Sequence, residues 1–204
     1  VVPALIALRR AHAELLPEHV VCGATDATAR LARGDLDVAF YYERISAPDL
    51  LVERLGQTTM AVYCGKGHPL FGRARVTPAD IEAHPFSVPQ VGDTRQSLDG
   101  WPSEAPRQIG MRITMLASNV QVCRAGLLLC VLPDVAAAEG VAAGELRRLA
   151  WPELPPIEVF AARAAAGRLA RADAVVAAAA DRLASLDLGG RRRAGRAQRA
   201  SVRS

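Results

Sequence analysis

Histidine and cysteine are the side chains of this sequence that could hold a metal ion or act as a nucleophile. The chain has four of each: His12, His19, His68 and His84, and Cys22, Cys64, Cys123 and Cys130. The histidines lie far apart without ligand spacing, and no cysteines form a C-x-x-C pair, so we expect no metal and no cofactor. Each cysteine lies among apolar residues. This predicts four reduced, buried thiols, and a disulfide or metal site is the less favoured alternative.

The sequence also lacks the common catalytic motifs. It has no G-x-S-x-G elbow and no H-E-x-x-H pair, and Gly65 to His68 lacks the spacing of a phosphate-binding loop. A cysteine–histidine nucleophile pair stays open as an alternative, because such partners meet only in the fold. Trp101 and Trp151 could be ligand platforms, but closing a loop onto the core is the favoured role. We therefore expect no catalytic residue and no enzyme.

The positive charge of the chain is concentrated at its C-terminus. The formal net charge is +4, and six arginines with no acidic residue among them follow Gly190, so that residues 1–190 carry −2 once those six are subtracted. The pattern predicts a disordered basic tail over 189–204 on a mildly acidic domain. A specific nucleic-acid contact by the tail is less favoured, because no aromatic residues interleave with the arginines.

The sequence gives no membrane signal. No stretch approaches the ~20 apolar residues of a membrane helix, and the apolar start lacks the basic region of a signal peptide. We therefore expect a cytoplasmic protein without a membrane partner. Because the chain starts with Val1 rather than methionine, it could be a fragment or a processed product.

Hydrophobic periodicity places these residues on alternating strands and helices, which predicts an α/β fold with mainly parallel sheets. Asp26 and Thr114 are expected to cap the second and fourth helices, and Thr77 followed by proline is a strong helix start. The predicted helices are 4–16, 26–33, 77–84, 114–125, 133–139 and 168–186. The predicted strands are 19–22, 36–41, 50–55, 59–64, 86–88, 111–113, 127–132, 146–149 and 158–162.

Three segments together resemble the LysR-type transcription regulators. Residues 29–40 (ARLARGDLDVAF) are similar to the family's leucine, glycine and "leucine-aspartate-x-alanine" pattern entering a strand. This match implies a structural rather than a catalytic role for Asp37, near the strand start. Residues 62–70 end in Gly-His-Pro-Leu, similar to the family's "His-Pro-Leu" after a strand. Residues 122–133 (VCRAGLLLCVLP) resemble its helix–glycine–strand–"leucine-proline" segment, although Leu128 stands where many members have a second glycine.

The resemblance implies a two-lobed type 2 periplasmic-binding-protein-like fold with a double crossover hinge. Lobe I would be residues 1–57 and 157–188, and lobe II residues 58–156, with a small effector between the lobes. The first strand of lobe I would be missing, so the effector site could be incomplete.

The same resemblance points to four loops as the effector site. The candidate effector-binding residues are Ala24, Thr25, Asp26, Tyr41, Tyr42, Gln90 and Thr114. The turn of Ala24, Thr25 and Asp26 precedes a helix, so its N–H groups could receive an anionic or polar ligand group, and Thr114 resembles a common polar position of the family. Helix capping is the competing role for Thr25, Asp26 and Thr114. Side chains alternate along a strand, so at most one of Tyr41 and Tyr42 should face a ligand.

We therefore expect the effector-sensing domain of a LysR-type DNA-binding regulator. Its partners would be a small-molecule effector and further copies of the chain, as a homodimer or tetramer packed through residues 4–16 and 115–125. DNA contact would be made only through a helix-turn-helix domain absent from this chain. The alternatives are a free-standing solute-binding protein of the same fold and a small α/β enzyme.

Overall fold

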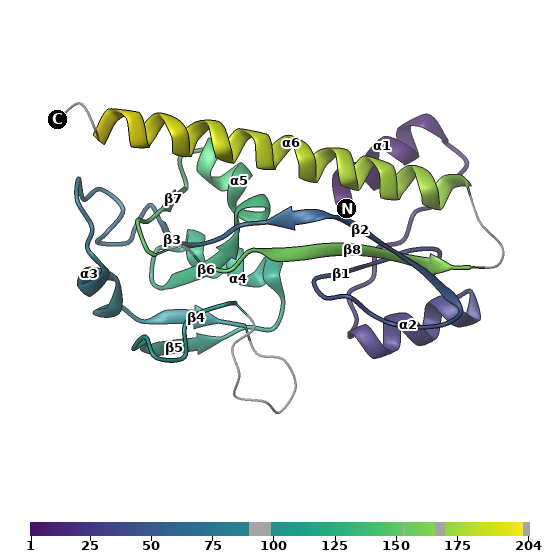
Figure 1. The fold of residues 1–204 in the computed structure, drawn as a ribbon, viewed down its shortest axis with the longest axis horizontal. Helices are drawn as coiled ribbons and strands as arrows, with labels where there is room; N and C mark the ends of the chain where they lie inside the picture. The colour runs from purple at the N-terminus through teal and green to yellow at the C-terminus, as the bar shows by residue number, and fades with distance from the viewer. Residues whose placement is uncertain (90–98, 153, 166–169, 202–204) are drawn as a thin grey trace. The chain divides into compact units, whose positions relative to one another are not determined.

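The computed structural model describes residues 1–89, 99–152, 154–165 and 170–201, the last sixteen of them as helix backbone only. The chain forms two compact units, which we call unit 1 (residues 1–57 and 158–204) and unit 2 (residues 58–157). Each unit has its own β-sheet with helices packed on it (Figure 1). The chain is thus a mixed α/β protein with two sheets, which agrees with the fold class predicted from the sequence.

Unit 1 contains a three-stranded sheet in the order β1-β8-β2, with β1 antiparallel to β8. Helix α2 packs on β1, and α1 packs against α6 (Figure 1). The core is small and gathers Ala27 and Leu31 of α2 with Tyr41, Leu50 and Phe160 of the strands. The elements are α1 (Val2–Ala11), α2 (Ala24–Arg33), β1 (Ala39–Tyr41), β2 (Leu50–Thr58), β8 (Ile157–Ala164) and α6 (Ala170–Ser201).

Unit 2 contains a five-stranded sheet in the order β5-β4-β6-β3-β7. Apolar clusters cover both faces of β3, because Met60, Val62 and Cys64 belong to one cluster, and Ala61 and Tyr63 to the other. The elements are β3 (Met60–Gly65), α3 (Pro78–Glu82), β4 (Phe86–Val88), β5 (Ile109–Arg112), α4 (Leu116–Arg124), β6 (Leu129–Pro133), α5 (Asp134–Ala142) and β7 (Leu146–Arg148).

The expected predominance of parallel pairing is wrong. β4 is parallel to β5 and β6, but β3 is antiparallel to β6 and to β7, and β1 is antiparallel to β8. The prediction failed because a continuous apolar run reports burial on both faces of a strand and carries no information on strand direction.

Several predicted element boundaries also needed correction. Helix α2 begins at Ala24 behind Gly23, so Asp26 lies in the first turn rather than at the cap. Helix α4 has Met115, not Thr114, at its N-cap. Residues 19–22 form no strand, and α6 runs from Ala170 to Ser201.

The strongest local signal in the sequence is confirmed. Thr77 caps α3 in a complete capping box with Asp80, and proline follows in the first turn. At the C-terminal end of α2, Gly34 has a φ of 78°, a backbone conformation that residues with a side chain rarely adopt.

Candidate functional site

The first candidate region is the N-terminus of α2 in unit 1. Gly23 occupies the N-cap in extended conformation, and no described side chain caps the helix. The N–H of Ala27 donates to the Gly23 carbonyl at 2.9 Å, so the open first-turn N–H groups are those of Ala24, Thr25 and Asp26. Thr25 and Asp26 are exposed. Their side chains are therefore available to solvent rather than committed to capping.

Asp26 changes the electrostatics of this helix end. Its carboxylate lies at the positive end of the helix dipole and 3.9 Å from the guanidinium of Arg30, one turn along the helix. A purely anionic ligand would meet this negative charge. A ligand that carries both an acidic and an amino group suits the combination of free N–H groups and a carboxylate better.

The two tyrosines at the end of β1 lie in different surroundings. Tyr41 is 6% exposed, belongs to the unit 1 core, and has its hydroxyl 3.3 Å from the hydroxyl of Thr28 in α2. The Thr28 hydroxyl also donates to the Ala24 carbonyl at 2.8 Å. Tyr42 is 55% exposed. The structure thus brings Tyr41 next to the first turn of α2 and leaves Tyr42 as the tyrosine open to solvent.

The second candidate region is the N-terminus of α4 in unit 2. Thr114 is exposed and precedes the N-cap residue Met115, and here too no described side chain caps the helix. The segment is held to the sheet by the N–H of Ile113, which donates to the Val88 carbonyl at 2.9 Å. Gln90 lies outside the described residues. Each unit therefore holds one uncapped helix start among the predicted site residues.

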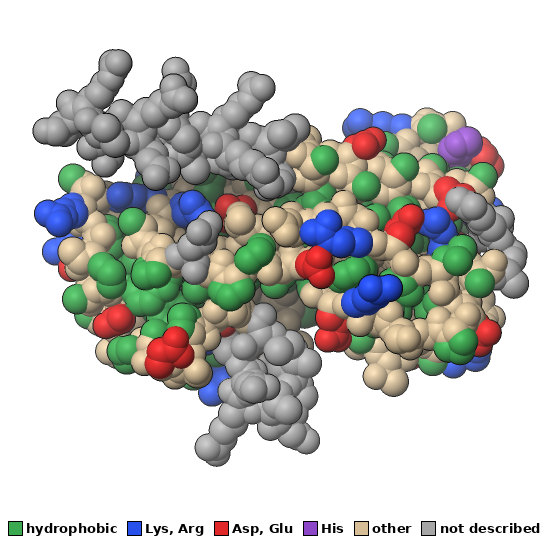
Figure 2. Space-filling model, in the orientation of Figure 1, with side chains coloured by type: hydrophobic (Ala, Val, Ile, Leu, Met, Phe, Trp, Pro, Cys, Tyr) green, Lys and Arg blue, Asp and Glu red, His purple; other side chains and the backbone are tan. Residues whose placement is uncertain are grey.

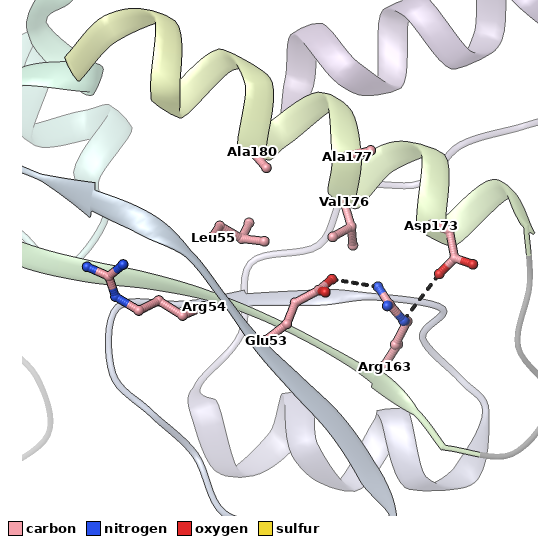
Figure 3. A pocket seen from close by; sticks show the side chains of 8 residues that line it. All are labelled: Glu53, Arg54, Leu55, Arg163, Asp173, Val176, Ala177 and Ala180. Carbon is pink, nitrogen blue, oxygen red and sulfur yellow. Dashed lines mark hydrogen bonds and ion pairs between the residues drawn. The ribbon is translucent and has the colours of Figure 1, made fainter. Parts of the chain in front are cut away.

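A hollow that the sequence did not reveal lies in unit 1, beneath α6 (Figure 3). It has a volume of about 310 Å³. Arg163 of β8 is bound there by Glu53 at 2.8 Å and by Asp173 at 3.2 Å, which ties β2 and α6 to β8. The sequence indicates this hollow only weakly. Its signals are the charged residues Glu53 and Arg54 in β2 and the small alanine residues in α6. Its lining residues are Glu53, Arg54, Leu55, Arg163, Asp173, Val176, Ala177 and Ala180.

Charged side chains of both signs are interspersed over unit 1 (Figure 2). Ion pairs in unit 1 include Arg33–Asp35, at 2.9 Å, and Arg54–Glu158, at 2.5 Å. This face of unit 1 therefore presents no large field of a single sign to a polyanion.

Three of the four cysteines lie in buried positions. Cys64, Cys123 and Cys130 are buried as predicted, but Cys22 is exposed, because residues 19–22 lie outside any strand. Burial raises the pKa of the Cys64 thiol to about 11, which disfavours the reactive thiolate. In the part of the chain that the structure describes, no group of three or more His, Cys, Asp or Glu side chains could hold a metal ion.

The two tryptophans serve the core of unit 2. Their rings stack at 4.5 Å, and both pack against one of its apolar clusters. The Trp101 indole N–H donates to the Ala105 carbonyl at 3.0 Å. This packing supports the structural role over the ligand platform.

A family model for the LysR substrate binding domain matches residues 1–184. The chain belongs to this family. The membership identified from three short segments is therefore confirmed along nearly the whole described chain. None of the helices among the described residues has the length and apolar character required to cross a membrane.

This LysR substrate-binding domain has relatives among curated proteins and solved structures. The SDS degradation transcriptional activation protein of Pseudomonas sp. (strain ATCC 19151) is 33% identical over 158 residues, which cover 76% of this chain and 50% of that protein. This chain therefore spans about half the length of the curated relative that it matches.

Two solved structures illustrate the shared fold. The regulatory domain of MetR, a LysR family regulator from Neisseria meningitidis, aligns with a TM-score of 0.59 and 16% identity, over 89% of this chain and 86% of that one. Full-length LysG from Corynebacterium glutamicum with bound effector Arg aligns with a TM-score of 0.61 and 22% identity, over 87% of this chain and 62% of that one. At these identities the likeness shows the fold alone.

Proposed function

We propose that this chain is the effector-sensing domain of a LysR-type transcription regulator. The observation that carries the proposal is the family match over residues 1–184 on a chain that folds as two α/β units. The domain would act by binding alone. A free-standing solute-binding protein of the same fold is less favoured, because the matched relatives are transcription regulators.

We propose one ligand-binding region in each unit, built in both cases on an uncapped helix start. In unit 1, the first-turn N–H groups of α2, the carboxylate of Asp26 and the exposed ring of Tyr42 are the binding groups. In unit 2, Thr114 and the first-turn N–H groups of α4 are the corresponding ones. N–H groups at a helix start bind carboxylates well, and Asp26 would bind an amine. A small amino acid or amino-acid-like compound fits this set, and LysG offers a precedent with its bound Arg.

The domain would act in the cytoplasm as a homodimer or a larger oligomer. The exposed apolar side chains of Ile6 and Met115, which lie in the two predicted contact segments, support the oligomer. Sedimentation velocity on Ile6→Arg should show a shift toward monomer relative to the unsubstituted chain. An unchanged distribution would remove α1 from the interface.

The ligand proposal is tested by a thermal-shift screen of the chain against amino acids, small carboxylates and aromatic acids. A ligand that binds the native state must raise the melting temperature by mass action. The shift produced by a hit should shrink in Asp26→Ala and in Thr114→Ala. The matched controls are Asp35→Ala and Ser103→Ala, which alter exposed side chains outside the candidate regions. A shift that survives both site substitutions would contradict the proposed site.

The regulatory proposal is tested on the complete protein. Fluorescence anisotropy with DNA from upstream of its own gene should show binding that changes when the hit compound is added. DNA binding that does not respond to any compound that stabilises this domain would contradict an effector-sensing role. Failure to bind DNA at all would favour the solute-binding alternative.

A further inference from the structure

The chain passes between the two units at two places, and the strands that make these crossings are neighbours in one sheet. The first crossing lies between Gln57 and Thr58, and the second between Ile157 and Glu158. β2 and β8 lie side by side in the sheet of unit 1. Any change in the orientation of one unit against the other must be absorbed by the backbone at these crossings.

On the unit 1 side, the two crossing strands are tied to each other. The Arg54 guanidinium donates to Glu158 at 2.5 Å, and the Arg163 guanidinium donates to Glu53 at 2.8 Å (Figure 3 shows the second pair). Arg54 also reaches the side-chain oxygen of Gln57 at 3.4 Å. The Arg54 pair is half exposed and contributes little to stability. Arg54 lies three residues before the first crossing and Glu158 directly after the second, so this pair ties β2 to β8 beside both crossings.

On the unit 2 side, the first crossing is held by Asp134, the first residue of α5. The Thr59 carbonyl accepts the N–H of Asp134 at 2.9 Å, and the Thr59 hydroxyl donates to the Asp134 carboxylate at 2.7 Å. Thr59 cannot turn without breaking both bonds. The other carboxylate oxygen of Asp134 accepts the hydroxyl of Tyr63 at 2.5 Å.

Tyr63 fixes the carboxylate in turn. Its side chain is only 2% exposed and packs in the unit 2 core, so its hydroxyl has one orientation available. Burial and the neighbouring Asp134 raise the pKa of Tyr63, so that the hydroxyl stays protonated and keeps donating. Hydrogen bonds to an ionised acceptor are about twice as strong as neutral ones.

The second crossing is held differently on the unit 2 side. Ile157 is partly buried and packs against the apolar cluster that contains Leu154, which is 3% exposed. Apolar contact is non-directional and tolerates rotation better than two hydrogen bonds joining the same pair of residues. The two crossings therefore differ, with a directional lock at the first and an apolar contact at the second.

We propose that Asp134 is a positioning residue that locks the first crossing to unit 2 through Thr59 and Tyr63. Rotation between the units is then confined to the backbone at Gln57–Thr58 and Ile157–Glu158. We call Thr59, Tyr63 and Asp134 the crossing lock. A movement of the backbone at the first crossing would be passed on to α5, because Asp134 is the first residue of that helix. This mechanical role does not depend on the identity of an effector.

Double electron–electron resonance on the full chain tests the crossing lock. One spin label would be placed on Cys22, which is exposed in unit 1, and one on Ser103→Cys, an exposed position in unit 2. The other three thiols are buried and should stay unlabelled in the native protein. Dilution with unlabelled protein removes distances between copies. We expect Thr59→Val and Asp134→Asn to broaden the distribution of distances between the two labels.

The matched control is Asp80→Asn in α3. Asp80 accepts hydrogen bonds from the N–H and hydroxyl of Thr77, much as Asp134 is bound, but it lies away from both crossings in the sequence. It should lower stability and leave the distance distribution unchanged. If Asp134→Asn unfolds unit 2, Thr59→Val and Tyr63→Phe remove single hydroxyl groups and carry the test. A folded Thr59→Val protein with an unbroadened distribution, or equal broadening in Asp80→Asn, would overturn the proposal.

Discussion

Two consecutive strands of this chain, β2 and β3, show how differently the two units are built. Every residue of β3 in unit 2 is buried, whereas only Leu50 and Thr58 at the ends of β2 are buried. The difference arises because apolar clusters cover the two sheets to different extents. Unit 2 has an apolar cluster on each face of a five-stranded sheet, and the described residues of unit 1 gather one cluster on a three-stranded sheet.

The difference extends to the surface. Most of the exposed large hydrophobic side chains among the described residues belong to unit 1: Val1, Val2, Ile6, Leu16, Val21, Tyr42 and Leu51. A small core with much exposed apolar area is marginal on its own and gains from partners that cover it. Unit 2 should therefore be the stable body of the domain, and unit 1 the part whose stability depends on what binds it.

Glycine substitutions should separate the two units most sharply. A Cβ on Gly65 in unit 2 would lie 2.1 Å from the Cys123 carbonyl oxygen, so the backbone itself would have to move. A Cβ on Gly23 in unit 1 would meet nothing within 4 Å. We expect Gly65→Ala to cost about 3 kcal/mol or more, the upper range of overpacking, and Gly23→Ala less than about 1 kcal/mol.

Urea unfolding measures this contrast. Both tryptophans of the chain, Trp101 and Trp151, pack in unit 2, so their fluorescence reports that unit, while circular dichroism reports both. The contrast between a tightly packed unit 2 and an open unit 1 would be contradicted if both substitutions lowered the free energy of unfolding equally. It would also be contradicted if Gly65→Ala lowered stability without a change in the unfolding curve measured by fluorescence.

What the sequence could predict depended on how far apart in the chain the interacting residues lie. A signal that acts locally was correct, namely the helix start at Thr77, since the partners of the cap lie within a few residues. The family membership was also correct, because it rests on the order of several short segments. The expected predominance of parallel pairing was wrong for β1 with β8 and for β3 with β6 and β7, because strand pairing depends on residues far along the chain.

The candidate site was predictable only in part. Asp26 and Thr114 were expected as caps, but Gly23 and Met115 occupy those positions, since the chain enters both helices one or more residues away from the best capping side chain. The hollow lined by Glu53 and Arg163 left no recognisable motif, because its residues are 110 positions apart and meet only through the pairing of β2 with β8.

Acid should weaken unit 2 through His68. The side chain is 4% exposed, and burial, followed by the nearby His84, lowers its pKa to about 4. The unfolded chain takes up a proton near pH 6.5. Between these values the unfolded state binds more protons, so the free energy of unfolding falls as the pH drops from about 6.5 to 4.

The measurement is the urea midpoint from tryptophan fluorescence at a series of pH values from 7 to 4.5. The Nδ1 atom of His68 accepts the N–H of Leu70 at 3.2 Å, so His68→Asn retains an acceptor there and should flatten the pH dependence. His12→Asn in unit 1, where the side chain is 53% exposed, is the matched control. An unchanged acid slope in His68→Asn would exclude His68 as its source.

Helix capping should give the smallest effects, of opposite sign in the two units. The Thr77 hydroxyl accepts the N–H of Asp80 at 3.3 Å, so Thr77→Ala should lower the stability of unit 2 by about 1 kcal/mol. Gly23→Ser would instead supply unit 1 with the cap that α2 lacks and should raise its stability slightly. If the free N–H groups of α2 hold an effector carboxylate, the new serine must compete for them, and the thermal shift produced by a hit compound should shrink in Gly23→Ser. A stabilised Gly23→Ser protein with an undiminished ligand shift would show that the effector does not use the α2 start.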